Sequence, residues 1–90
     1  MDYEWDPAKD LANRRGHGVE FAEAVIALED ELAITIPDSD AEGEERFVSL
    51  GMDGVGRVLV TVFTIRDERI RVISSRCATR TEQRHYEEGQ

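Results

Sequence analysis

The sequence predicts a small α+β domain: an antiparallel β-meander with two N-terminal helices and one C-terminal helix. Three observations lead to this prediction. Two segments near the start repeat apolar residues at helical spacing, and a run of strand-like segments joined by short turns follows them. A helix-start signal then stands close to the C-terminus. Strands joined in sequence by short turns pair in antiparallel fashion, and helices then pack against the sheet. At this length we expect residues 1–90 to form a single domain around one core.

The first element expected is a short strand over residues 3–5, followed by a helix. Asp6 is placed to cap that helix, and Pro7 is suited to its first position. We expect the helix to run to about Arg15. The glycines on either side of His17 then end it, because either of them can adopt the left-handed conformation of a helix C-cap.

A second helix is expected over residues 20–30, followed by a strand over residues 32–36. The helix would bury one face, since apolar side chains recur at the spacing i, i+3, i+4, i+7. That face consists of Phe21, Ala24, Val25 and Leu28. Pro37 ends the strand, and residues 38–45 form an acidic loop.

Three further strands and a last helix complete the prediction. The strands are expected over residues 46–50, 57–65 and 69–75, with turns between them. The middle strand is apolar on both of its faces, which is typical of a central strand covered on two sides. Thr79 and Glu82 have the spacing of a capping box, so the final helix is expected to begin near residue 80.

The net charge of −9 is distributed unevenly along the chain. Residues 1–45 carry three basic residues against fourteen acids, a net charge of −11, while residues 46–90 carry eight arginines against six acids, a net charge of +2. The plain interpretation is a set of solvated surface charges, and the sharper one is a basic face on an acidic body. The negative total works against general nucleic-acid binding, so any contact with RNA has to be local.

The composition also bears on compartment and cofactors. Cys77 is the only cysteine and the N-terminus shows no apolar secretory segment, which predicts a reducing cytoplasm. No apolar run approaches the ~18–20 residues of a membrane-spanning helix, so we expect no membrane contact. Two histidines and one cysteine far apart make no zinc pattern, and we expect neither a metal nor a cofactor.

Residues 71–88 carry the strongest functional signal. This segment reads as a strand that leads directly into a helix. Four arginines, one acid and one tyrosine lie near the junction of this strand and helix: Arg71, Arg76, Arg80, Arg84, Glu82 and Tyr86. Arginine holds phosphate or carboxylate with two parallel hydrogen bonds, so the junction is a candidate anion site.

Three segments together carry a more specific pattern, in a fixed order over nearly the whole chain. The first contains Glu4-Trp5-Asp6, Lys9, Asn13, His17-Gly18-Val19, Phe21 and Glu23-Ala24; the second contains Gly43-Glu44-Glu45-Arg46-Phe47 and Gly56-Arg57-Val58-Leu59-Val60; the third contains Arg71-Val72-Ile73-Ser74, Arg76, Ala78-Thr79, Glu82 and Tyr86-Glu87. This series resembles the signature of BrnT-type proteins.

The resemblance implies a toxin of a bacterial type II toxin–antitoxin pair with a RelE-like α+β fold. It implies a metal-independent endoribonuclease that cleaves cellular RNA and inhibits growth. It further implies neutralisation by a BrnA-type antitoxin, a small protein with a DNA-binding domain that regulates its own operon. The toxin would then form a hetero-oligomer with the antitoxin and contact DNA only through it.

Four residues are our catalytic candidates. Metal-free RNA cleavage uses the 2′-hydroxyl of the substrate and needs a base, an acid and cations that stabilise the phosphorane. We predict that Arg76 and Arg80 stabilise phosphate, while His17 and Lys9 assist. Histidine titrates near neutral pH, which suits proton transfer. The structural alternatives are ion pairs of the arginines and the lysine with nearby acids, such as Glu82, and a histidine that only caps its helix.

Four further residues are candidates for substrate binding. Arg46 and Arg57 lie at strand ends, where they would line the same sheet face or act as solvated edge charges. Arg71 begins the strand that leads to the anion site. Tyr86 either acts on the substrate or packs its ring on the sheet, and Glu82 is interpreted as a helix cap.

Two departures from the family pattern keep other functions open. Gly16 and Cys77 stand where the family usually has basic residues. Together with the acidic net charge, they favour a second hypothesis, a catalytically weak or inactive binding module in an antitoxin–DNA regulatory complex. A third hypothesis is a structural adaptor that docks a basic protein through its acidic N-terminal half, in contacts that salt would weaken.

Overall fold

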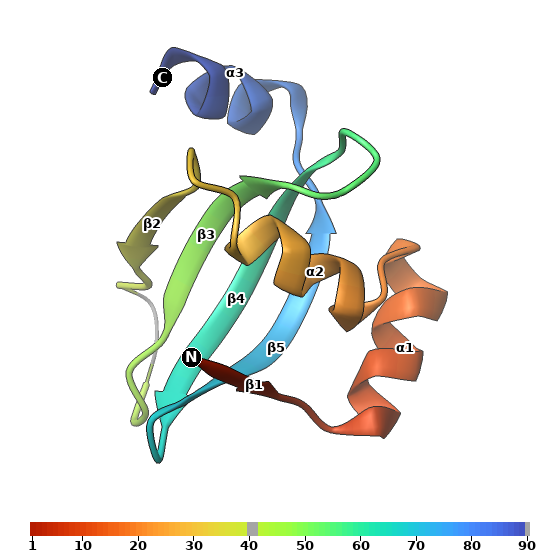
Figure 1. The fold of residues 1–90 in the computed structure, drawn as a ribbon, viewed down its shortest axis with the longest axis vertical. Helices are drawn as coiled ribbons and strands as arrows, with labels where there is room; N and C mark the ends of the chain where they lie inside the picture. Colours follow the sequence, from red (N-terminus) through yellow and green to blue (C-terminus); the bar gives the residue numbers. More distant parts are fainter. Residues whose placement is uncertain (40–41, 90) are drawn as a thin grey trace.

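Over residues 1–39 and 42–89, the part of the chain that the computed structural model describes, the protein forms a five-stranded sheet and three helices (Figure 1). The elements are β1 (Asp2–Glu4), α1 (Pro7–His17), α2 (Phe21–Leu28), β2 (Ile34–Pro37), β3 (Phe47–Met52), β4 (Val58–Arg66), β5 (Arg69–Cys77) and α3 (Arg80–Glu88). The predicted α+β class and the order of the elements are confirmed. Residues 40–41 of the predicted acidic loop lie outside the described residues.

The strands are arranged in the order β1-β5-β4-β3-β2. The pairs from β2 to β5 are antiparallel and form the predicted meander. The edge strand β1 is different, because it pairs with β5 in parallel and aligns Glu4 with Arg71. The sheet is therefore mixed rather than wholly antiparallel. Turn signals between neighbouring strands cannot predict this pair, since its two strands lie at opposite ends of the sequence.

Helix α2 covers one face of the sheet, as Figure 1 shows. The contacts consist of two buried groups: Phe21 and Ala24 with Val72, and Val19 and Ala27 with Leu59. The approach is closest at Gly51, where an added Cβ would lie 2.1 Å from the carbonyl oxygen of Ala27. Glycine at this position therefore allows the helix backbone to contact the sheet directly.

Helix α1 begins and ends as the sequence predicts. The Asp6 carboxylate accepts a hydrogen bond from the Ala8 N–H at 2.9 Å, and Pro7 occupies the first turn. Gly18 takes the left-handed C-cap conformation with φ at 71°. The buried Asn13 then joins α1 to β5, through hydrogen bonds to the backbone of Ser75. Helix α1 therefore lies beside β5 with its C-terminal end near the sheet.

Helix α3 begins with the predicted capping box. The Thr79 hydroxyl accepts from the Glu82 N–H at 3.2 Å, and the Glu82 carboxylate accepts from the Thr79 N–H at 2.8 Å. Further along the helix, the buried Tyr86 donates its hydroxyl hydrogen to Asp30. This bond holds α3 at the end of the sheet where β3 ends, at the top of Figure 1.

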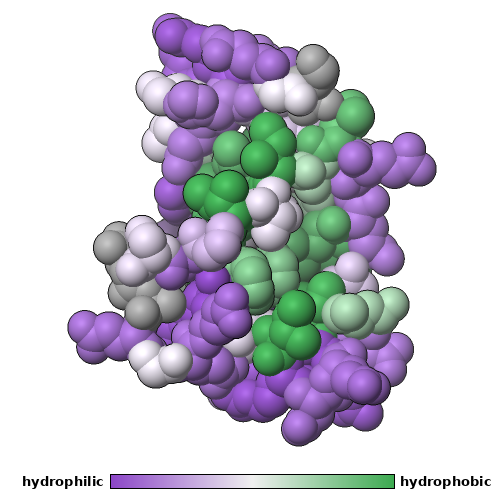
Figure 2. All heavy atoms as spheres, turned by 90° about the vertical axis from the view of Figure 1, so that its left-hand side faces the viewer, coloured by the Kyte–Doolittle hydropathy of each residue, from purple (hydrophilic) through white to green (hydrophobic). Residues whose placement is uncertain are grey.

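We call the sheet face opposite α2 the open face, because in Figure 1 none of the helices of the described residues lies across it. Its side chains include those of Val48, Val60, Val62, Thr64, Arg66, Arg71, Ser74 and Arg76. At the β2 edge, Ile36 pairs with Val48 and is 58% exposed. Figure 2, viewed from this edge, shows an apolar band between polar regions. The open face thus reaches the edge of the sheet as an apolar surface.

None of the helices within the described ranges has the length and apolar character that a membrane-spanning helix requires.

Candidate functional site

Arg71 and Arg76 both lie on the open face because β5 contains a β-bulge. Val62 pairs with Ser74, but the next residue of β4 pairs with Val72, so Ile73 is an extra residue in β5. In a regular strand, two residues five positions apart point to opposite faces. The extra residue changes this alternation and brings both arginines to one side.

The first hollow of the open face has a volume of about 340 Å³. Its lining residues are His17, Val48, Val60, Val62, Ser74, Ser75 and Arg76. The floor is therefore largely apolar, and the polar groups His17 and Arg76 come from the ends of α1 and β5. Two of the predicted catalytic residues thus lie in one cavity, although 59 positions separate them in the sequence.

Arg76 is held by Glu82, the capping residue of α3. Its Nη1 and Nη2 atoms donate to the two carboxylate oxygens of Glu82 at 2.8 Å and 3.0 Å. The bonds from the Arg76 guanidinium lower the pKa of Glu82 to about 2, against the opposing effect of burial. The same pair raises the pKa of Arg76. Both partners are therefore charged at neutral pH, and the predicted structural alternative of an Arg76–Glu82 pair is confirmed.

A second hollow, of about 100 Å³, lies further along the same face. Its lining residues are Lys9, Glu44, Arg46, Thr64, Arg66, Arg71 and Ile73. Two of its arginines are in ion pairs, Arg66 with Glu44 at 2.6 Å and Arg71 with Glu4 at 2.7 Å. Within the described ranges Lys9 and Arg46 form no direct ion pair. This hollow is therefore the more basic of the two.

Lys9 and His17 lie on the same side of α1 but in different hollows. They are eight residues apart, which corresponds to about 12 Å along a helix. Both residues border the open face, but they do not share one cavity. Lys9 therefore lies away from the cavity that contains His17.

Arg57 does not lie on the open face. Its guanidinium bonds to Asp53 at 2.7 Å, to Glu23 of α2 at 2.8 Å and to the carbonyl oxygen of Gly18 at 3.2 Å. The expectation that Arg46 and Arg57 line the same sheet face is therefore wrong. The physical reason is that side chains alternate between the two faces of a strand. Arg57 directly precedes β4, two residues before Leu59, so its side chain points to the same side as Leu59, toward α2.

The Arg57 cluster is a structural element. Asp53 is buried, and burial raises the pKa of its carboxyl. Hydrogen bonds from the backbone and guanidinium of Arg57 and from the Val55 N–H outweigh burial and hold that pKa below its ordinary value. Arg57 thus neutralises a buried charge between the β3–β4 turn and α2.

Arg80 and Tyr86 line neither hollow of the open face. Arg80 is exposed in the first turn of α3. Tyr86 is buried, and its hydrogen bond to Asp30 together with burial raises its pKa to about 12. Its role in substrate binding stays a prediction, and in this structure its hydroxyl fastens α3 to the turn after α2.

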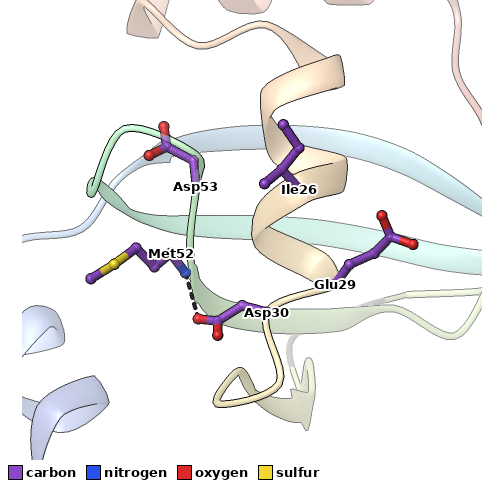
Figure 3. Close-up of a pocket in the computed structure, with 5 residues that line it drawn as sticks. All are labelled: Ile26, Glu29, Asp30, Met52 and Asp53. Carbon is purple, nitrogen blue, oxygen red and sulfur yellow. Dashed lines mark hydrogen bonds between the residues drawn. The ribbon is translucent and has the colours of Figure 1, made fainter.

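A third hollow of about 400 Å³ lies on the α2 side of the sheet (Figure 3). It is lined by Ile26, Glu29, Asp30, Met52 and Asp53, and the Met52 N–H donates to Asp30 at 2.9 Å. Among the described residues, its lining contains three carboxylates and no cation. A phosphate would be repelled here, so the open face is the better candidate for binding an anion.

Sequence reasoning missed two residues that shape the site, Asn13 and Ile73. Asn13 places α1, and Ile73 is the extra residue of the bulge. A polar residue within a helix was the available signal for Asn13. Nothing in the local pattern of β5 indicates the position of the bulge. Among the described residues, no three His, Cys, Asp or Glu side chains are grouped in a way that would hold a metal ion.

A family model described as ribonuclease toxin, BrnT, of type II toxin-antitoxin system matches residues 5–82. The chain is similar to the crystal structure of the Brucella abortus ribonuclease toxin BrnT, with 25% sequence identity and a TM-score of 0.69. That match covers 89% of this chain and 99% of the Brucella chain. No curated protein sequence matches significantly.

Proposed function

This chain belongs to the BrnT family of ribonuclease toxins of type II toxin–antitoxin systems, and from this premise we propose that it is an endoribonuclease that cleaves cellular RNA without a metal ion and inhibits growth. The observation that carries the proposal is the cavity of the open face, which Arg76 and His17 line together. A titratable side chain and a fixed guanidinium in one cavity are the groups that this chemistry needs.

In the proposed reaction the 2′-hydroxyl of one nucleotide attacks the adjacent phosphorus. His17 takes the proton of that hydroxyl, a bond forms between the 2′-oxygen and phosphorus, and the bond to the 5′-oxygen breaks. The leaving 5′-oxygen takes up one proton from solvent, to which His17 returns the proton that it took, and the products are a cyclic phosphate and a free 5′-hydroxyl. Arg76 stabilises the charge that develops on the non-bridging phosphate oxygens.

The second hollow supplies the proposed contacts to the RNA backbone. Lys9, Arg46 and Arg71 line it, next to the cavity along β4 and β5. Such contacts bind any sequence, because phosphate groups repeat along the chain. Arg80, at the exposed start of α3, lines neither hollow and is proposed to add a phosphate contact outside them.

The type II family implies an antitoxin partner, and we propose a BrnA-type protein for that role. An inhibitor of a phosphate site gains from presenting carboxylates to it. The antitoxin is therefore proposed to cover the open face with acidic side chains and to form a cytoplasmic hetero-oligomer. DNA would be contacted only through the antitoxin, in agreement with the net charge of −9 on this chain.

The test is a growth experiment with an inducible gene. Expression of the wild-type chain is expected to stop bacterial growth, and co-expression of the antitoxin is expected to restore it. The Arg76→Ala, Arg80→Ala double variant is expected to be harmless at the same protein level. Full toxicity of this double variant would reject the proposed site.

A second candidate function is a binding module without strong catalysis. One observation favours it: Arg66, Arg71 and Arg76 of the open face are each paired with an acid of the same chain. Such pairs reduce the charge that an RNA chain meets. This candidate predicts harmless expression of the wild type together with retained antitoxin binding.

A further inference from the structure

The hydrogen bonds that Arg76 makes within the described residues come from its Nη1 and Nη2 atoms. Arginine carries five N–H donors in a plane, which form an end-on edge through Nη1 and Nη2 and a side-on edge through Nε and Nη2. Glu82 takes the end-on edge, with one oxygen on each Nη atom. Nη1 also donates to the carbonyl oxygen of Cys77, at an N···O distance of 3.3 Å.

The side-on edge of Arg76 has no acceptor among the residues that the structure describes. A carboxylate on the end-on edge and a phosphate on the side-on edge occupy different donors, so they do not exclude one another. Glu82 therefore does not compete with a substrate for Arg76. It removes the rotational freedom of a long side chain that is 43% exposed at the rim of the cavity.

Glu82 is itself fixed, and its position derives from the start of α3. Its carboxylate accepts from the Thr79 N–H at 2.8 Å, while its own N–H donates to the Thr79 hydroxyl at 3.2 Å. The Glu82 carboxylate thus accepts from the Thr79 N–H and from Arg76 at the same time. The backbone at the start of α3 therefore fixes the carboxylate that holds Arg76.

We infer that Glu82 is a positioning residue of this site, which holds Arg76 by its end-on edge and leaves the Nε–Nη2 edge for the scissile phosphate of RNA. This inference rests on the proposed function and assigns to Glu82 a role beyond capping α3. A guanidinium that is already oriented loses less freedom when the phosphate arrives, so more of its interaction stabilises the transition state.

Two variants separate this role from capping. Glu82→Gln keeps a residue that serves in a capping box but loses the carboxylate that holds Arg76. Thr79→Ala loses the hydroxyl of the cap, while the backbone N–H that bonds to Glu82 remains. The first variant therefore weakens the positioning contact, and the second weakens mainly the helix.

The experiment measures single-turnover cleavage of a labelled RNA of randomised sequence at saturating protein. We expect Glu82→Gln to slow cleavage by about 10-fold, with RNA affinity within about 3-fold of the wild type, as expected for a loss in the transition state. Thr79→Ala is expected to lower the thermal midpoint and to leave the rate within about 2-fold. In an Arg76→Ala background, Glu82→Gln is expected to cause no further slowing, since it acts through Arg76.

The outcomes separate the two proposals. No cleavage by the wild type would reject the proposed function and the inference with it. Wild-type cleavage with an equally fast Glu82→Gln, or with equal slowing in the Arg76→Ala background, would reject the inference alone. If Glu82→Gln fails to fold, Glu82→Asp keeps the charge on a shorter arm, and a wild-type rate for that variant would also reject the inference.

Discussion

Asn13 of α1 and Ser75 of β5 are joined by a pair of hydrogen bonds across 62 positions of the sequence. The Asn13 amide donates to the Ser75 carbonyl oxygen at 2.7 Å, and its oxygen accepts from the Ser75 N–H at 3.1 Å. A side-chain amide thus completes the backbone bonding of β5 where β1 has ended. Since α1 also carries His17 and Lys9, this contact determines where both residues meet the open face.

Asn13→Ala is expected to reduce the free energy of unfolding by about 2–3 kcal/mol, because buried backbone groups of Ser75 and Val19 lose their partners. Asn13→Asp is expected to be at least as harmful, since a carboxylate would face two carbonyl oxygens and can donate to neither. Urea unfolding of both variants is the measurement. An Asn13→Asp variant as stable as the wild type would contradict this account of the contact.

Alanine substitutions at Gly51 and Gly54 test how closely α2 packs against the sheet, because only Gly51 lies in tight contact with the helix backbone. A Cβ at Gly51 would lie 2.1 Å from the Ala27 carbonyl oxygen, while at Gly54 the nearest atom would be Ile26 Cδ1 at 3.9 Å. We expect Gly51→Ala to destabilise the fold by about 2–3 kcal/mol through overpacking, and Gly54→Ala to have little effect. Thermal unfolding of the two variants should separate them clearly, and equal midpoints would show that α2 does not approach β3 so closely.

Tyr86→Phe is expected to reduce the free energy of unfolding at neutral pH by about 1–2 kcal/mol, through loss of the hydrogen bond to Asp30. The pKa of Tyr86 is raised from 10.0 to about 12 in the folded state, chiefly by that bond. The stabilisation is therefore fully present below pH 10 and is lost as the pH rises from 10 toward 12.

The measurement for Tyr86 is the difference in unfolding free energy between wild type and Tyr86→Phe as a function of pH. This difference is expected to shrink above pH 10. Because the variant keeps every other titrating group, their contributions cancel in the comparison. A difference that stays constant across this range would mean that the hydroxyl does not carry the raised pKa.

Arg46→Ala and Arg71→Ala are expected to weaken RNA binding in a salt-dependent manner. Each lost phosphate contact should reduce the slope of log affinity against log salt by about 0.7 for single-stranded RNA. Fully 2′-O-methylated RNA is the probe, because it lacks the nucleophile and is not cleaved. Arg15→Ala is the control, since this exposed arginine of α1 lies two residues before His17 and so on another side of the helix. Equal weakening by all three variants would point to net charge rather than the open face.

The parts of the fold that depend on local patterns follow from the sequence. The caps at Asp6, Thr79 and Glu82 and the meander from β2 to β5 are confirmed, because each depends on residues close together in the chain. Contacts between distant segments do not follow in this way. The parallel pairing of β1 with β5 joins the two ends of the chain, and no residue pattern within either segment specifies it.

The candidate site shows the same division. The segment that contains Arg76 and Glu82 was identified from its arginines and its capping spacing. The face on which each arginine lies depends on strand parity. The extra residue Ile73 moves Arg71 to the side of Arg76, while Arg57 lies on the α2 side and neutralises a buried acid. A bulge and a buried charge are properties of the packed sheet, so residue type alone does not reveal them.

The central claim is that Arg76 stabilises phosphate during RNA cleavage without a metal ion. Its most direct test is the incubation of labelled RNA with purified wild type, Arg76→Ala and Arg15→Ala in the presence of EDTA. We expect the wild type and Arg15→Ala to cleave at similar rates and Arg76→Ala to be slower by at least about 100-fold. Cleavage by Arg76→Ala at the wild-type rate, or loss of wild-type cleavage on addition of EDTA, would contradict the claim.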